Sequence, residues 1–385
     1  MKFTETHFFF IVVLLSIIFL SVGNYIASGD GWRPDDTFTP DFYNGVITEI
    51  IERDASEMDF GDGFFVSDVI ITFSARLTSG DRSGEEITAR QLISTMFFTG
   101  EREVRDGDRV VLVYDAFNSD FFFANFIRIN AVMVLGGVFL MLVVLFGRKK
   151  GFSAIVALGI TCMAVFLVFI PAILSGRNIY IVTIIVCVFS IVSTLMLVIG
   201  PNKKALSAML GCLGGVLAAG LLMYIMDFIL SLTGVLDGEA QSLLILPTDN
   251  PIDLRAIVFA GVIIGAVGAI MDVAMSIASS LWEVKETGHV NDFGEIVKSG
   301  ISIGKDILGT MLNTLILAYI GSSLSLILII TAHTTSFIDL FNMELIIVEF
   351  LRALVGSFGM LLAIPLTALV SGWLYSSEES FVYRY

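Results

Sequence analysis

The stretch GAIMDVAMSIASSLWEV (residues 268–284) places one carboxylate, Asp272, inside a long apolar run that begins after Arg255. The run is long enough to cross a bilayer as a helix, which takes about 20 residues. Trp282 follows ten residues after Asp272, a separation of about 15 Å along a helix axis. If Trp282 marks the membrane interface, Asp272 lies near the bilayer midplane. The role of a carboxylate at that depth is the central question that this sequence raises.

The composition of the whole chain agrees with membrane insertion. Of 385 residues, 56% are hydrophobic and only 15% are charged, whereas soluble domains have about a quarter charged residues. The sequence predicts a polytopic α-helical membrane protein with about eight transmembrane helices. The predicted helices cover residues 8–23, 126–147, 152–174, 179–200, 205–231, 256–282, 306–330 and 345–374.

The chain divides into four predicted parts. Residues 1–23 form an N-terminal transmembrane anchor; a cleaved signal peptide is the alternative, although no Ala-x-Ala-like site follows closely. Residues 24–125 are polar and contain β-type runs with a turn signal at 78–84, which predicts a small all-β module, barrel or sandwich, of about five strands. The remainder is a seven-helix membrane domain, 126–376, and a tail, 377–385. The β-type runs are 43–52, 64–77, 85–94 and 108–117.

The lysines predict the orientation of the chain. All eight lysines lie in or beside one alternate set of connections between the predicted helices, and the other set has none. Because positively charged loops stay in the cytoplasm, both termini are predicted to be cytoplasmic and the β module extracytoplasmic. Residues 24–130 carry 20 acidic and 9 basic residues, and this acidic balance argues against nucleic acid as a partner.

The predicted cytoplasmic loop 283–305 has an amphipathic pattern of its own. Asp292 and Glu295 stand three residues apart, as in a capping box, and apolar residues then recur on one helical face. The pattern predicts a short cytoplasmic surface helix at 292–303. The apolar positions are Phe293, Ile296, Val297 and Ile301. No cluster of His, Cys and carboxylate side chains has metal-ligand spacing, so neither a metal nor another cofactor is predicted.

Helical spacing groups the polar residues of two consecutive predicted helices into two stripes. The first contains Asp272, Ser276, Ser279, Ser280 and Glu283, and the second contains Asp306, Thr310, Asn313 and Thr314. Stripes on antiparallel neighbours can face each other and hide their polar groups from lipid, where a carboxylate costs at least ~2.5–3.5 kcal/mol. Such a carboxylate is either a functional group or a hydrogen-bonding link between helices.

Two glycine pairs predict close helix packing. Gly261 and Gly265 form a GxxxG pair on the helix of Asp272, and Gly211 and Gly215 form another on the preceding helix. Glycine at this spacing lets two helix backbones approach closely, so all four residues are predicted packing positions.

Two stretches carry a resemblance to a known family. GAIMDVAMSIASSLWEV (268–284) and GKDILGTMLNTLILAYIGSSL (304–324) look like the YibE/YibF-like family of bacterial multi-pass membrane proteins, over about residues 126–375. The resemblance implies a bacterial plasma membrane location and no established activity. The order of a Gly-rich stretch, Asp272, a surface helix and a Thr-containing helix is also similar to the SecD/SecF and RND permease group. That similarity is a mechanistic analogy, because a shared arrangement does not establish a shared function.

Two hypotheses of function follow. In the first, the protein is an ion-coupled transporter or exporter component in which Asp272 carries a proton or cation and Asp306 lies at the cytoplasmic mouth. The hydrogen-bonding partners of Asp272 would be Ser276, Thr310 and Asn313. In the second, it is a non-transporting scaffold or sensor whose β module binds a partner.

No enzymatic activity is predicted. An intramembrane aspartyl protease using Asp272 and Asp306 would carry a Gly-x-Gly-Asp motif, and this chain has Gly304-Lys305-Asp306 instead. The expected partners are the lipid bilayer, an ion and a solute of unknown chemistry. The sequence is compatible both with a homo-oligomer and with a complex that contains a partner membrane protein.

Overall fold

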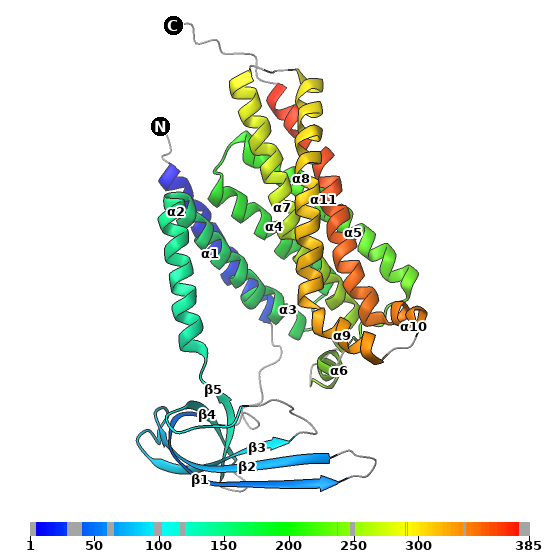
Figure 1. Cartoon of the computed structure of the whole chain (residues 1–385). Coiled ribbons are helices and arrows are strands. Elements are labelled where there is room, and N and C mark those ends of the chain that lie inside the picture. Colours follow the sequence, from blue (N-terminus) through cyan, green and yellow to red (C-terminus); the bar gives the residue numbers. More distant parts are fainter. Residues whose placement is uncertain are drawn as a thin grey trace. The chain divides into compact units, whose positions relative to one another are not determined.

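The computed structural model describes residues 5–28, 41–59, 65–94, 102–115, 120–236, 238–246, 251–288, 290, 292–333 and 336–376. The chain forms two compact units, one of residues 33–142 and one of residues 1–32 with 143–385 (Figure 1). The predicted tail 377–385 lies outside the described residues.

A closed five-stranded barrel, coloured blue and cyan in Figure 1, makes up most of the first unit. The strands follow the order β1-β2-β3-β5-β4 around the barrel, and every neighbouring pair is antiparallel except the parallel pair β3–β5. This is the topology of an OB-type barrel, and it confirms the prediction of a small β module. The strands are β1 (Asp41–Asp59), β2 (Phe65–Leu77), β3 (Glu86–Ser94), β4 (Arg109–Asp115) and β5 (Asp120–Phe126).

Alternating apolar residues build the barrel interior. On β2, every second side chain from Ile71 to Leu77 is buried, and Val110 and Leu112 of β4 join the same core. β1 pairs with both β2 and β4, and its register shifts after Ile47 and again after Ile50. Such bulges bend a strand, which lets one strand serve two neighbours and close the barrel.

The sequence pattern identifies four of the five strands and misses β5. This strand reads DFFFANF, and a helix of apolar residues starts soon after it, at Ile129, so the alternation is hidden in one long apolar stretch. Phe121 nevertheless points into the barrel, and β5 closes it by pairing with β3 and β4. The first predicted transmembrane helix after the module therefore begins three residues later than its predicted start at 126.

Because β5 closes the barrel, a fragment of residues 33–128 is expected to fold alone and a fragment of residues 33–118 is not. Without β5, strands β3 and β4 lose their shared partner and the barrel core loses Phe121. Far-ultraviolet circular dichroism and urea unfolding of the two fragments measure this difference. Equal, cooperative unfolding of both fragments would contradict the assigned topology.

The second unit is a helical bundle. At its centre α7 (Leu254–Gly288) and α11 (Glu344–Ser376) pack against each other, and both α5 (Lys203–Leu230) and α8 (Phe293–Ser322) contact this pair (Figure 1). The other helices are α1 (Glu5–Ser28), α2 (Ile129–Ala164), α3 (Ile170–Leu174), α4 (Ile179–Val198), α6 (Gly238–Ile245), α9 (Leu324–His333) and α10 (Phe337–Asn342), with a π-helical turn at Val165–Phe169.

Seven helical segments of the described chain are long and apolar enough to cross a membrane, judged by length and composition. One of them, 129–174, has 46 residues and is interrupted at Arg148, whose backbone (φ 50°, ψ −126°) is not helical. A side chain at Gly151 would overlap the carbonyl group of Val143. Residues eight positions apart in a straight helix are separated by about 12 Å, so the chain turns back at Arg148. The segment therefore contains two helices, which correspond to two separate predicted apolar runs.

The predicted surface helix at 292–303 is wrong as a separate element. Residues 293–303 are the first turns of α8, which continues without a break to Ser322. The predicted loop ends at the charged pair Lys305–Asp306, but α8 carries this pair on its exposed side without interruption. The predicted helix 306–330 is correspondingly shifted, since α8 ends at Ser322 and α9 begins at Leu324.

The predicted start of this helix is nevertheless correct. The Asp292 side chain accepts a hydrogen bond of 3.0 Å from the backbone N–H of Glu295, which is an N-cap contact. The apolar face of the first turns packs within the bundle, because Ile296 is 1% exposed and Gly372 of α11 lies against Val297.

Candidate functional site

Asp272 lies near the middle of α7, 18 residues after Leu254 and 16 residues before Gly288. Its side chain is exposed, whereas Ile270 and Val273, which point in other directions from the same turn, are fully buried. The carboxylate therefore points away from the bundle core in a single chain.

The outward face of α7 changes character at Asp272. Towards Leu254 it consists of Gly261, Gly265 and Gly268, all exposed, and a Cβ atom added at Gly261 or Gly268 would meet nothing within 4 Å. In the other direction the face continues with half-buried Ser276 and Ser279. Asp272 thus lies between two halves of this face. The half towards Leu254 is formed by glycines, and the other half is lined by serine hydroxyl groups.

The polar residues predicted on α8 are exposed as well. Asp306, Thr310, Asn313 and Thr314 lie at the surface of the single chain. The hydroxyl groups of Thr310 and Thr314 donate to carbonyl oxygens of their own helix, at Ile307 and Thr310, over 2.9 Å each. Within the described part of the chain, no hydrogen bond joins Asp272 to Ser276, Thr310 or Asn313.

Two close approaches fix the register of α7 against α8. A Cβ atom at Gly265 would lie 3.1 Å from the Tyr319 hydroxyl, and one at Gly300 would lie 2.9 Å from Leu281. Asp272 lies between these two contacts along α7, and the corresponding position along α8 is close to Thr310. The two polar stripes therefore lie at the same height along the bundle, but they do not bury each other, since Asp272 and the polar residues of α8 are exposed.

No basic side chain pairs with Asp272 in the part of the chain that the structure describes. Over the same residues, no group of three or more His, Cys, Asp and Glu side chains could hold a metal ion. The chemistry that this arrangement offers is therefore that of a single carboxylate with a hydroxyl group one turn away.

The two predicted glycine pairs behave differently. A side chain at Gly211 would overlap Thr367, and a Cβ atom at Gly215 would lie 2.8 Å from the carbonyl oxygen of Gly359 on α11. These glycines bring α5 and α11 together. Gly261 has open space around it, and Gly265 meets only the Tyr319 hydroxyl, so this second pair forms no helix contact of the predicted kind.

A buried hydroxyl cluster between α5 and α11 was missed by sequence reasoning. The hydroxyl groups of Ser207 and Ser371 form a short hydrogen bond, and the Tyr375 hydroxyl donates to the carbonyl oxygen of Ala278 over 3.2 Å. Trp282 packs edge-to-face on the Tyr375 ring, with 5.2 Å between the ring centroids, so the Trp282 side chain is partly enclosed. The sequence pattern that indicates this cluster is the spacing of Thr367, Ser371 and Tyr375, which follow one another at four-residue steps along one helix.

An ion pair between α5 and α7 was missed for a different reason. Asp227 of α5 is 8% exposed and accepts from the Arg255 guanidinium of α7 at 3.0 Å. The two residues are 28 positions apart and lie on different helices, so no local pattern links them. The pair joins the ends of α5 and α7 and explains how a carboxylate is tolerated there.

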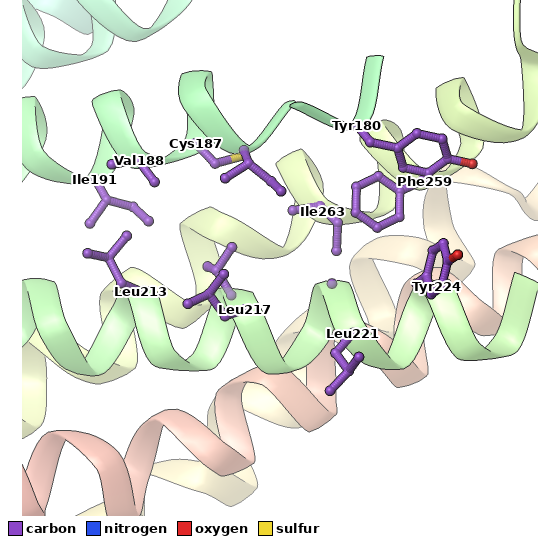
Figure 2. A pocket seen from close by; sticks show the side chains of 13 residues that line it. Tyr180, Cys187, Val188, Ile191, Leu213, Leu217, Leu221, Tyr224, Phe259 and Ile263 are labelled. Carbon is purple, nitrogen blue, oxygen red and sulfur yellow. The ribbon is translucent and has the colours of Figure 1, made fainter. Parts of the chain in front are cut away.

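An apolar pocket of about 300 Å³ lies between α4, α5 and α7 (Figure 2). Figure 2 shows Tyr180, Tyr224 and Phe259 at one end of it and Ile191 and Leu213 at the other. Asp272 is not among the lining residues, so the pocket and the carboxylate are separate features of the bundle.

Comparisons with known proteins agree with the sequence motifs. A family model described as YibE/F-like protein matches residues 135–377, which is more than half of the chain and includes Asp272 and all of α8. Comparisons with curated proteins and with solved structures gave no match. The barrel lies before the matched region, so the match rests on the helices alone. The chain belongs to the YibE/F-like family.

Proposed function

We propose that this protein spans a bacterial plasma membrane with eight helices and is an ion-coupled transporter or exporter component in which Asp272 carries the proton or cation. The observation that carries the proposal is the position of Asp272, exposed at mid-helix and without a hydrogen-bond or ion-pair partner among the described residues. Lipid contact would cost this carboxylate at least ~2.5–3.5 kcal/mol. A link between helices would need a bond to a second helix, and the described chain supplies none.

The two halves of the α7 face suggest how an ion would reach Asp272. Ser276, Ser279 and Glu283 extend from Asp272 over about 16 Å and offer oxygen atoms along that distance. On the other side, Gly261 and Gly268 leave free volume next to the helix. Each half would form one side of an aqueous path that meets at the carboxylate. Asp306, Thr310 and Asn313 belong to neither half in the single chain.

The proposal fixes a topology that can be measured. Eight spans place Lys149, next to the turn at Arg148, in the cytoplasm and Ser79, on the barrel, outside. In a background with exposed Cys162 replaced by Ser, a Ser79→Cys variant should react with a membrane-impermeant thiol reagent in intact cells. A Lys149→Cys variant should react only after the membrane is opened. Labelling of position 149 but not of position 79 would overturn the topology.

The direct test of function is proton or cation flux in proteoliposomes that contain purified wild-type protein or the Asp272→Asn variant. Asn preserves the size of the side chain and most of its hydrogen bonds, but it does not ionise. Flux by the wild type that the variant lacks would support the proposal. Equal flux would remove Asp272 from the mechanism.

A second candidate function is a scaffold or sensor that works through the barrel. Ile70 of β2 and Leu92 of β3 are directly opposite each other on the outer surface and are 41% and 59% exposed. A contiguous exposed apolar patch marks a protein contact, and in this second function the Ile70–Leu92 pair would form part of one. An Asp272→Asn variant that is fully active in cells would favour this scaffold or sensor function over ion-coupled transport.

A further inference from the structure

The outward face of α8 is polar from Ser302 to Thr314, whereas the inward face of the helix is apolar. The inward side packs on α7 and α11 through buried Ile296, Gly300 and Gly304 and continues with half-buried Ile307, Leu308 and Met311. A helix that meets lipid on its outer side should show apolar residues there. This polar part of the outer face, residues 302–314, therefore requires a protein or water cover within the membrane.

The outer face has the spacing of a helix-pairing seam, which we call the α8 seam. Its residues follow at alternating steps of four and three, the heptad spacing that packs two helices at about 20°. The members are Ser302, Asp306, Gly309, Asn313, Ile316 and Ile320. All are exposed except half-buried Ile316. A Cβ atom at Gly309 would meet nothing within 4 Å, so contacts inside the chain do not require this glycine.

We infer that the α8 seam pairs with the α8 seam of a second copy of this chain, about a two-fold axis along the membrane normal. Such an axis brings each seam residue against its own counterpart. The amide of Asn313 both donates and accepts, so two Asn313 side chains can bond to each other across the axis, and an Asn at such a position fixes register. Gly309, one turn away, lets the two backbones approach.

Charge complementarity favours a second copy over an unrelated membrane protein. Lys305 borders the seam beside Asp306, and both side chains are exposed, without an ion-pair partner in the described chain. Across a two-fold axis, Lys305 of each copy reaches Asp306 of the other, so two ion pairs form from one adjacent pair of residues. The inference rests on the proposed membrane insertion, but it does not depend on ion coupling by Asp272.

Cysteine cross-linking in native membranes tests the pairing. In a background with Cys162 replaced by Ser, leaving Cys187 and Cys212 buried, single variants Ser302→Cys, Gly309→Cys and Ile320→Cys should give a disulfide-linked dimer under mild oxidation. Thr314→Cys is the matched control, because Thr314 is exposed on the same helix but about 100° from Asn313. It should give no dimer.

Three results would overturn the inference: no cross-link at the seam, equal cross-linking at Thr314, or a seam cross-link to a protein of different mass. As a second measurement, the wild type should be a dimer by light scattering in mild detergent, and the Gly309→Leu variant should be a monomer. A dimeric Gly309→Leu variant would also contradict the seam. An Asp272→Asn chain should cross-link like the wild type, so loss of flux and loss of pairing can be told apart.

Discussion

The Asp272→Asn variant is expected to insert and fold like the wild type and to lose all ion-coupled flux. The substitution removes a charge that no described side chain neutralises, so the thermal midpoint should be unchanged or slightly raised. Asp272→Glu keeps an ionisable group on a longer side chain and should retain part of the flux. The outward position of Asp272 leaves room for the extra methylene group.

A purely structural Asp272 would reverse this order. Asn would then be the mild substitution in both stability and activity, and Glu the disruptive one. The measurement is the thermal midpoint of each purified variant beside its flux in proteoliposomes. Asp339→Asn provides a control, since Asp339 is an exposed carboxylate of α10, a helix that contacts α11. A stable Asn variant with full flux would contradict the proposed role.

The second large effect is expected from leucine at Gly215, with Gly261→Leu as its matched control. A side chain at Gly215 meets the Gly359 carbonyl oxygen at 2.8 Å, Ile270 at 2.8 Å and Ala363 at 2.9 Å. The first of these atoms is backbone, so α5 and α11 must separate. Overpacking of this kind costs about 1–3 kcal/mol or more, and we expect loss of most folded protein.

Gly261→Leu should be neutral or stabilising. No atom lies within 4 Å of the added Cβ, and leucine favours a helix over glycine by up to about 1 kcal/mol. Yield and thermal midpoint after purification compare the two variants. Equal destabilisation would contradict the packing described for the two glycine pairs. A stable Gly261→Leu variant with reduced flux would support the aqueous path beside this half of α7.

Several features of this protein follow from short windows of sequence. Apolar runs of sufficient length predict the long helices, and the Asp292–Glu295 spacing predicts the start of α8. Alternating β-branched and aromatic residues predict four barrel strands. The position of Asp272 at mid-helix follows from counting residues along one run. In each case the determining interactions lie within a few turns of a helix or within one strand.

The tertiary structure decides which face of each element meets which neighbour. Gly211 and Gly215 read like Gly261 and Gly265, yet only the first pair brings two helix backbones together, because only α5 has α11 against that face. Asp227 finds Arg255 across 28 residues, and β5 is recognised as a strand only through its pairing with β3 and β4. Periodicity defines a polar face but not its direction. Asp272 and the α8 seam point outward because the apolar faces of α7 and α8 are buried against α11, a contact that depends on residues far away in the chain.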